Sequence, residues 1–226
     1  MEGDADLDVK SVFDTFVKRY DKWYDKPFGK SAFRLEKDCI EFLCGDLAKP
    51  FLELGVGTGR FAVALNVEYG VDISIAVLRF AKKRGIKVIR GDGQKLPFAD
   101  EFFGAIFLIV TLCFVDDPLK VLEEAVRISK RKGAIILGLI LKESPWAVFY
   151  EKKSEEGNVF YNIARFYSFK EVESMLANVG LEIEEIRSTM FQCPTVNPLD
   201  FECSWKGFFK KAGFVAIKAR KIGDSY

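Results

Sequence analysis

Three glycines at alternate positions, Gly55, Gly57 and Gly59, interrupt an apolar stretch of the chain. The residues before them, 51–54, suit a strand, and those after them, 61–65, suit the start of a helix. Glycine has no Cβ to keep a ligand away from the backbone, and it tolerates the positive φ of a tight turn. Because free N–H groups at a helix start favour an anion, the turn predicts a site for a nucleotide-like ligand. Alternate glycines by themselves are also compatible with a plain strand-to-helix turn.

Two aspartates follow at places where such a ligand could use them. Asp72 ends a short predicted strand and lies 17 residues after Gly55. This is close to the spacing at which a βαβ unit presents a carboxylate to the ribose hydroxyls of a nucleoside. The alternative is that Asp72 only caps the helix that begins near Ser74. Asp92 follows the next strand, at the edge where ligands bind in open α/β sheets.

The composition narrows the possible classes of protein. The 226 residues are 49% hydrophobic and 30% charged, with a formal net charge of +1, which suits one well-buried core and argues against an obligate nucleic-acid partner. The first six residues are acidic and lack the signature of a signal peptide. The apolar runs at 105–113 and 134–141 are much shorter than the roughly 20 residues of a membrane span. We therefore expect a cytoplasmic protein without a membrane span.

The chain contains no histidine. This removes Ser-His and Cys-His nucleophile systems and most zinc or iron sites. Its five cysteines include no CxxC pair, so we expect no metal site and buried or incidental thiols. Any enzymatic chemistry must proceed without imidazole. The five are Cys39, Cys44, Cys113, Cys193 and Cys203.

The hydrophobic pattern predicts two helices, then five strands that alternate with helices, which requires a parallel sheet with right-handed crossovers. A capping box at Ser168 and Glu171 begins a late helix that ends near Gly180. The last two strands have no helix between them and should pair antiparallel. The first helices are predicted at 7–24 and 31–47, separated by a break at 27–29, and the strands at 51–54, 66–72, 86–90, 103–110, 134–141, 181–187 and 214–220.

Two aromatic segments interrupt this alternation, at 143–167 and 188–213. Irregular insertions at the carboxyl edge of a sheet are more often lids or binding loops than linkers. Near the N-terminus, Tyr20 and Tyr24 belong to an aromatic group that either packs in the core or covers a ligand at the glycine turn.

Together these motifs resemble the class I S-adenosylmethionine-dependent methyltransferases, in particular their quinone- and small-molecule-type branch, which is methyltransferase type 11-like. The order and spacing of the motifs carry the resemblance over about residues 50 to 181. The motifs are the glycine turn with its acid at 53–59, the strand end at 70–72, the loop at 91–98, and the segments at 164–168 and 177–181.

This resemblance implies an α/β fold, a Rossmann-like three-layer sandwich. Its seven-stranded, mostly parallel sheet would have the order 3-2-1-4-5-7-6, with strand 7 antiparallel, preceded by two N-terminal helices. The chain 1–226 would be a single methyltransferase domain. Within it we expect an N-terminal helical cap at 1–48, a cofactor-binding core at 49–142, and substrate-side lids at 143–167 and 188–213.

The resemblance also implies roles for individual residues toward S-adenosyl-L-methionine. The glycines would lie under its methionine part, with Glu53 near its amino group, while Asp72 and the adjacent Ile73 would lie at the ribose. Asp92 would accept from the adenine amino group, and strand 4 would end facing the methyl group. The implied cofactor residues are Glu53, Gly55, Gly57, Gly59, Asp72, Ile73, Asp92, Gly93, Gln94, Val110 and Thr111, with Leu112 beside them.

Two other functions fit the same architecture less well. An NAD(P)-dependent oxidoreductase of Rossmann type needs a glycine where the chain has Arg60, and Glu53 would lie awkwardly near a pyrophosphate. A non-catalytic S-adenosylmethionine-binding protein is the other, although the acids at three strand ends argue against a decayed site.

The methyl acceptor is expected to be a small molecule. The residues at 111–114 do not match the tetrapeptide of methyltransferases that act on base amines or glutamine amides. The aromatic segments favour a partly apolar acceptor, whose O, N, S or C nucleophile stays open, as does a monomeric or dimeric state. If a neutral hydroxyl is methylated, a general base is needed, for which Tyr20 and Tyr24 are weak candidates.

Overall fold

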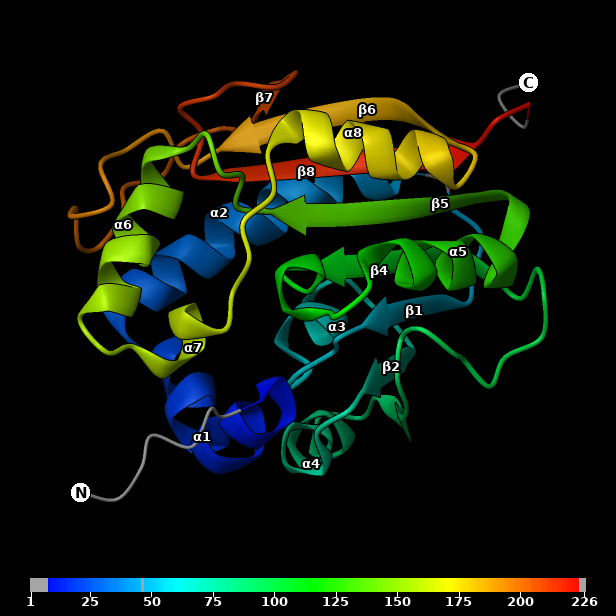
Figure 1. Cartoon of the computed structure of the whole chain (residues 1–226), viewed down its shortest axis with the longest axis horizontal. Helices are drawn as coiled ribbons and strands as arrows, with labels where there is room; N and C mark the ends of the chain where they lie inside the picture. The colour runs from blue at the N-terminus through cyan, green and yellow to red at the C-terminus, as the bar shows by residue number, and fades with distance from the viewer. Residues whose placement is uncertain (1–7, 46, 224–226) are drawn as a thin grey trace.

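A single eight-stranded sheet runs through the computed structural model, which describes residues 8–45 and 47–223 (Figure 1). The strand order is β3-β2-β1-β4-β5-β8-β6-β7. β1 to β5 pair in parallel, and β8 lies antiparallel to both β5 and β6. The strands are β1 (Phe51–Leu54), β2 (Tyr69–Asp72), β3 (Lys87–Arg90), β4 (Phe103–Ile109), β5 (Ser129–Leu139), β6 (Leu181–Thr189), β7 (Trp205–Lys206) and β8 (Phe214–Lys221).

The predicted mostly parallel sheet is confirmed, as is the antiparallel pairing of the last two long strands. The predicted number of seven strands is wrong by one, because β7 adds a two-residue edge strand beside β6 within the predicted loop 188–213. A strand this short has no alternation to recognise and is defined only by its distant partner. β5 also begins at Ser129, before the predicted 134, since a charged stretch precedes its apolar run.

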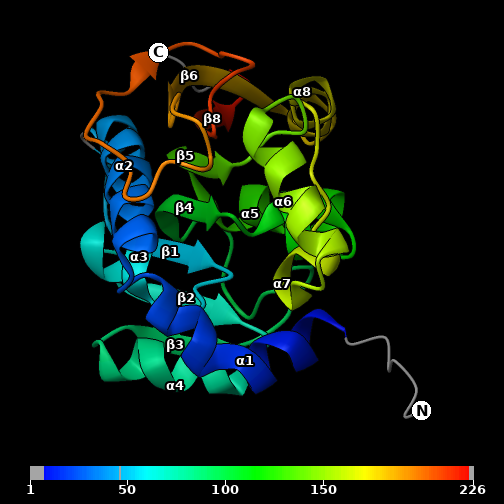
Figure 2. The same ribbon diagram turned by 90° about the vertical axis from the view of Figure 1, so that its left-hand side faces the viewer.

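Helices cover both faces of the sheet (Figures 1 and 2). α2 and α3 pack on one face with residues such as Phe51 and Phe107, while α5 and α8 pack on the other with Leu52 and Leu108. Successive strand residues thus alternate between the two cores, as the pleat requires. The helices are α1 (Val9–Trp23), α2 (Pro27–Cys44), α3 (Arg60–Ala64), α4 (Ile75–Lys83), α5 (Pro118–Ile128), α6 (Pro145–Glu155), α7 (Val159–Asn162) and α8 (Phe169–Asn178), with a 3₁₀ turn η1 (Leu112–Phe114).

The two predicted N-terminal helices are present, but the second begins earlier than predicted. α2 starts at Pro27, where the sequence predicted a break, because proline is tolerated in the first turn of a helix. Gly29 continues the helix, and a Cβ there would approach the carbonyl oxygen of Trp23. Leu7, predicted in the first helix, lies outside the described residues, as do the acidic residues 1–6.

The predicted irregular insertion at 143–167 contains two helices, α6 and α7. Ser144 caps α6 by accepting from the backbone N–H of Ala147, and the fully buried Trp146 donates from Nε1 to the carbonyl of Gln192 at 3.1 Å. The mixture of charged and aromatic residues hides the helical period here. The predicted capping box of α8 is confirmed. Across residues 8–45 and 47–223, none of the helices combines the length and apolarity that crossing a membrane requires.

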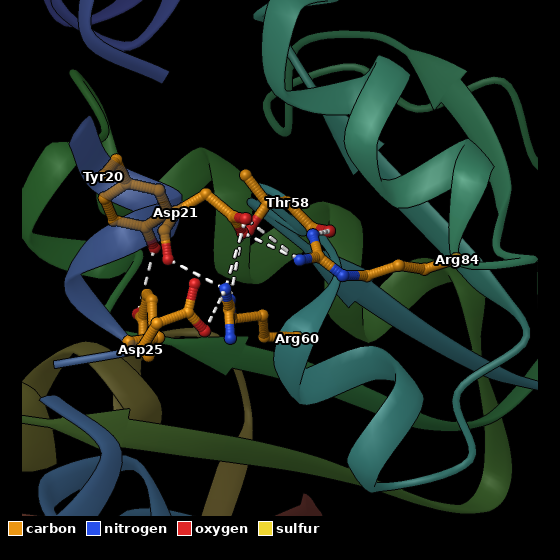
Figure 3. A network of polar contacts seen from close by, with 7 residues as sticks. Tyr20, Asp21, Asp25, Thr58, Arg60 and Arg84 are labelled. Atoms are coloured by element: carbon orange, nitrogen blue, oxygen red, sulfur yellow. Dashed lines mark hydrogen bonds and ion pairs between the residues drawn. The ribbon is translucent and has the colours of Figure 1, made fainter. Parts of the chain in front are cut away.

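An ion-pair network fastens α1 to the glycine turn. Asp21 is 9% exposed and accepts hydrogen bonds from Nε of Arg60 at 2.9 Å and from Nη2 of Arg84 at 3.0 Å. Arg84 also donates to the carbonyl oxygen of Thr58 at 2.6 Å. Figure 3 shows both guanidinium groups converging on Asp21, with the exposed Asp25 on Arg60. The network therefore joins α1, the glycine turn and the end of α4.

The two arginines hold the pKa of Asp21 near 2, below its ordinary value of 3.8, despite the opposing effect of burial. A carboxyl group whose pKa is lower in the folded protein stabilises that protein once it is ionised. Its contribution is therefore complete above about pH 4 and is lost as the pH falls toward 2.

We predict that Asp21→Asn lowers the free energy of unfolding by about 2 kcal/mol at pH 7, because it leaves the half-buried guanidinium groups of Arg60 and Arg84 without the carboxylate that they share. Asp25→Asn is the matched control, since its exposed carboxylate also pairs with Arg60 and should contribute less than about 1 kcal/mol. Urea denaturation at pH 7 and pH 3 measures both. The loss of unfolding free energy between pH 7 and pH 3 should also be smaller in Asp21→Asn than in the wild-type protein. Equal losses of stability in the two variants would contradict the role of Asp21.

Candidate functional site

A cavity of about 640 Å³ lies at the carboxyl ends of β1, β2 and β4. Its volume falls within the range of about 300–1,000 Å³ that is usual for small-molecule sites, and its position is the edge where open α/β sheets bind ligands. Most residues predicted from the sequence line it. These are Tyr20, Tyr24, Gly55, Gly57, Asp72, Ile73, Asp92, Gly93, Gln94, Val110 and Thr111.

Two predicted residues, Glu53 and Gly59, lie behind the cavity wall and do not line it. Glu53 is inside β1, on the face that α3 covers. Gly59 begins α3 with φ +81°, and a Cβ there would lie 3.0 Å from Ala81 of α4. Its direct role is therefore close packing of the turn against α4. Leu112 is fully buried in η1 and is also outside the wall.

Glu53 is a buried carboxyl group with an unsatisfied oxygen. Its side chain is 2% exposed, and Oε2 has no hydrogen-bond partner within the part of the chain that the structure describes. Burial, with the nearby charge of Asp72, raises its pKa well above the ordinary value. An orphaned acid of this kind fits a positively charged ligand group better than an anionic one.

The glycine turn is shaped by close contacts and by its own hydrogen bonds. A Cβ on Gly55 would lie only 2.4 Å from the side chain of Thr111. The N–H groups of Gly55 and Val56 donate to the carbonyl of Val71, and the N–H of Gly57 donates to Asp72 at 3.0 Å. Acceptors in β2 thus already bind the N–H groups at the start of the turn, which precede the N–H groups of the α3 start for which the sequence predicts an anion.

Asp72 connects the glycine turn with α4. One oxygen accepts from Gly57, and the other accepts from the backbone N–H of Ser74 at 2.9 Å. Ser74 itself caps α4 and donates from its hydroxyl to Asp14 of α1 at 2.6 Å. Burial raises the pKa of Asp72 in spite of these hydrogen bonds. Asp72 thus links the glycine turn to α4 and also lines the cavity.

The loop after β3 contributes Asp92, which is exposed at the cavity rim. It accepts hydrogen bonds from the backbone N–H of Gln94 at 2.9 Å and from its side-chain amide at 3.2 Å. These bonds fix the turn, and Gly93 lies between the two residues against Val121 of α5.

Val110 has a strained backbone at the end of β4. Its φ of +48° is uncommon for a β-branched residue, and its N–H donates to the carbonyl of Gly138 at 2.8 Å. Such conformations cost about 1–3 kcal/mol and gather at ligand sites. The turn brings Val110 and Thr111 to the cavity wall.

Aromatic side chains also line the cavity. The ring of Phe13 lies 5.3 Å from Tyr20, 5.4 Å from Phe114 and 5.6 Å from Phe160. These rings come from α1, η1 and α7, and Figures 1 and 2 both show α7 next to α1. Segments that are distant in the sequence therefore close this part of the cavity.

The hydroxyl groups of Tyr20 and Tyr24 lie 3.2 Å apart. Burial raises the pKa of both, so they are protonated near neutral pH. A neutral phenol donates hydrogen bonds and does not accept a proton as a general base.

The cavity wall also contains residues that were not predicted as site residues, among them Glu36, Tyr150 and Tyr161. Glu36 lies on the buried side of α2. The sequence feature that could have identified it is an acid within an otherwise apolar helical stripe. Tyr150 and Tyr161 stack with ring centroids 4.4 Å apart. They belong to the aromatic insertion, whose two helices the sequence did not reveal.

Comparisons with known proteins agree with this geometry. The family described as "Methyltransferase domain" matches residues 52–137. A crystal structure from Thermotoga maritima, titled a SAM-dependent methyltransferase and possible histamine N-methyltransferase, is 35% identical with a TM-score of 0.84, covering 94% of this chain and 99% of that one. An uncharacterized protein of Methanocaldococcus jannaschii is 40% identical over 94% of this chain and 100% of its own length. A demethylmenaquinone methyltransferase of Mycobacterium sp. is 30% identical over 58% of each chain.

We predict that Gly55→Ala lowers the free energy of unfolding by about 3 kcal/mol or more, since the new Cβ would combine a positive φ with a clash against Thr111. Gly57→Ala is the matched control, because φ is also positive but the nearest atom, in Tyr20, is 3.6 Å away. Its cost should be about 1–2 kcal/mol. Chemical denaturation checks the difference, and equal costs would show that the Thr111 contact does not constrain the turn.

Proposed function

The chain belongs to the class I S-adenosylmethionine-dependent methyltransferases, and we propose that it transfers the methyl group to a small, partly apolar molecule bound in the aromatic half of the cavity. The observation that supports this proposal is the division of one cavity into two chemically different halves. Polar groups gather at the strand ends, whereas the helices and η1 contribute the aromatic side chains of what we call the aromatic half: Phe13, Tyr20, Tyr24, Phe114, Tyr150, Phe160 and Tyr161.

The polar half fits S-adenosylmethionine. The orphaned Glu53 carboxyl offers a partner for an amino group, although it lies behind the wall. The absence of a Cβ at Gly55 and Gly57 leaves room for a ligand close to the backbone. We infer that Asp72, beside Ile73, binds the ribose hydroxyls, and that Asp92 accepts from the adenine amino group, with Gly93 and Gln94 beside the ring.

The bound cofactor supplies an activated methyl group on a sulfonium sulfur. The protein contributes to catalysis by orienting the acceptor and by excluding water. We infer that Val110 and Thr111 position the reacting groups, because the strained turn brings both to the wall between the two halves. α1 and α7 shield this region through the contacts of Phe160 with Phe13 and Tyr20.

The oxidoreductase alternative has no support in the comparisons. The turn is also unsuited to a pyrophosphate, because the N–H groups of Gly55, Val56 and Gly57 are already bonded within the protein. Arg60, which stands where a dinucleotide fingerprint needs glycine, is used to hold α1.

We infer a cytoplasmic location from the cysteines. All five are free, and Cys193 and Cys203 are exposed. Exposed free thiols are typical of a reducing compartment.

We predict that Asp72→Ala weakens binding of S-adenosylmethionine by about 1.5–3 kcal/mol, the usual loss when hydrogen bonds to a charged group are removed. Titration calorimetry measures the affinity. Asp117→Ala is the control, because Asp117 also accepts a backbone N–H at a helix start but lies outside the cavity wall. It should lose up to about 2 kcal/mol of stability and no affinity. Unchanged cofactor affinity in folded Asp72→Ala would refute the ribose role.

The acceptor class can be tested with methyl-labelled S-adenosylmethionine and three groups of acceptors: small apolar molecules, nucleic acid, and protein. We expect transfer to small molecules, and a loss of about tenfold in kcat/KM for Phe160→Ala, roughly 1.4 kcal/mol of transition-state stabilisation. Phe102→Ala serves as control, since Phe102 is 41% exposed and outside the cavity. Transfer to nucleic acid or protein alone would overturn the proposal, as would transfer to no acceptor in any of the groups.

A further inference from the structure

The carboxyl group of Glu36 is buried without a partner beside the cavity. Its residue is 6% exposed, it lies on α2 and it lines the cavity wall. Within residues 8–45 and 47–223, no side chain or backbone group makes a hydrogen bond or ion pair with this carboxyl group. Burial of an unpaired carboxylate is costly, so the position calls for a ligand or a functional reason.

Four tyrosines from three helices line the same cavity as this carboxyl group. The hydroxyls of Tyr20 and Tyr24 on α1 bond to each other at 3.2 Å, while Tyr150 of α6 and Tyr161 of α7 stack on one another. The charge of Glu36 would raise the pKa of all four phenols, which places them in its electrostatic range.

Among the described residues, three cations line the cavity wall, Lys10, Arg19 and Lys26. Lys10 pairs with Asp14 at 2.9 Å, and Arg19 lies over the ring of Phe160 at 5.8 Å. The chain has no histidine. A positive charge near Glu36 would lower its pKa, yet the only cause acting on that pKa is burial, which raises it to about 7. Lys26, at the start of α2, makes no ion pair with Glu36 among the described residues and does not act on its pKa. The cavity wall therefore supplies an acid and aromatic rings, and none of its three cations is paired with that acid.

We propose that Glu36 and the tyrosines Tyr24, Tyr150 and Tyr161 form a subsite that binds a protonated amine of the methyl acceptor. This inference rests on the proposed function, in which the aromatic half of the cavity holds the acceptor. An ammonium group would gain a charge-assisted hydrogen bond from the carboxylate and attraction from the electron-rich ring faces.

Other acceptor classes match the subsite less well. A phenolate or a carboxylate would be repelled by the charge of Glu36 and would have to be bound beside a second unpaired anion. An alcohol or an amide can hydrogen-bond to the carboxyl group in either protonation state but brings no positive charge that would favour its ionised form. A protonated amine satisfies both the charge and the hydrogen-bonding capacity.

Binding of an amine should also release a proton. The titratable groups that face Glu36 are the four tyrosines and Cys39 of the same helix, and burial raises the pKa of each of them, that of Cys39 to about 12. These groups stay protonated near neutral pH. Because Glu36 alone among them has a pKa of about 7, a bound cation favours its ionised form and a fraction of a proton leaves.

The test compares two probes of similar shape, phenethylamine, which is protonated at pH 7, and 2-phenylethanol, which is neutral. Titration calorimetry is run with S-adenosylhomocysteine present and in buffers with different ionisation enthalpies, which reports proton release. We expect the wild-type protein to bind the amine at least tenfold more tightly than the alcohol, with release of protons. Glu36→Gln should lower the affinity for the amine by at least tenfold and change the affinity for the alcohol by less than twofold. It should also abolish the proton release.

Glu41→Gln is the matched control, because Glu41 is an exposed acid on the same helix that pairs with Lys37, and it should bind both probes as the wild-type protein does. Equal affinity of the wild-type protein for the two probes, or no binding of the amine, would overturn the subsite even if Glu36→Gln failed to fold. Unchanged amine affinity in folded Glu36→Gln would overturn it as well. S-adenosylhomocysteine binding is measured separately, so loss of that binding indicates failure of the proposed function and not of the subsite.

Discussion

The contact between Asp72 and the N–H of Gly57 joins the ends of β1 and β2, and the cavity takes its shape from this contact. The second carboxylate oxygen of Asp72 positions Ser74 at the start of α4, and Ser74 in turn bonds to Asp14 of α1. The carboxylate of Asp72 thus links the glycine turn to α4 and, through Ser74, to α1. Because the turn uses its own N–H groups in this way, the polar half of the cavity has a fixed shape before any ligand binds.

The polar half was predictable because its residues lie directly after strands, at positions that the order of the elements determines. A glycine turn after β1, an acid at the end of β2 and a loop after β3 need only the order of the elements to come together, since parallel strands end at one edge. Asp72 and Asp92 line the cavity as expected. Glu53 and Gly59 do not, because the alternation along β1 and the packing on Ala81 turn them behind the wall.

The aromatic half was less predictable because it depends on how distant helices pack. Tyr20, Tyr150 and Tyr161 come from three different helices, and two of these helices have no recognisable period in the sequence. The position of Glu36 depends on which side of α2 faces the cavity, which only tertiary packing decides. The strained φ of Val110 likewise follows from the hydrogen bond to Gly138 and not from any local propensity.

α1 is fastened by different kinds of contact on its two sides. Toward the sheet, α1 is held by the charged hydrogen bonds of Asp21 and by the bonds of Asp14 to Ser74 and Ala76. Toward α7 it is held by ring contacts and one cation–π contact, all to Phe160. Separating α1 from the glycine turn would expose paired charges, whereas separating it from α7 would break only weak contacts. The seam between α1 and α7 is therefore the weaker of the two attachments of α1, and it depends on a single side chain, that of Phe160.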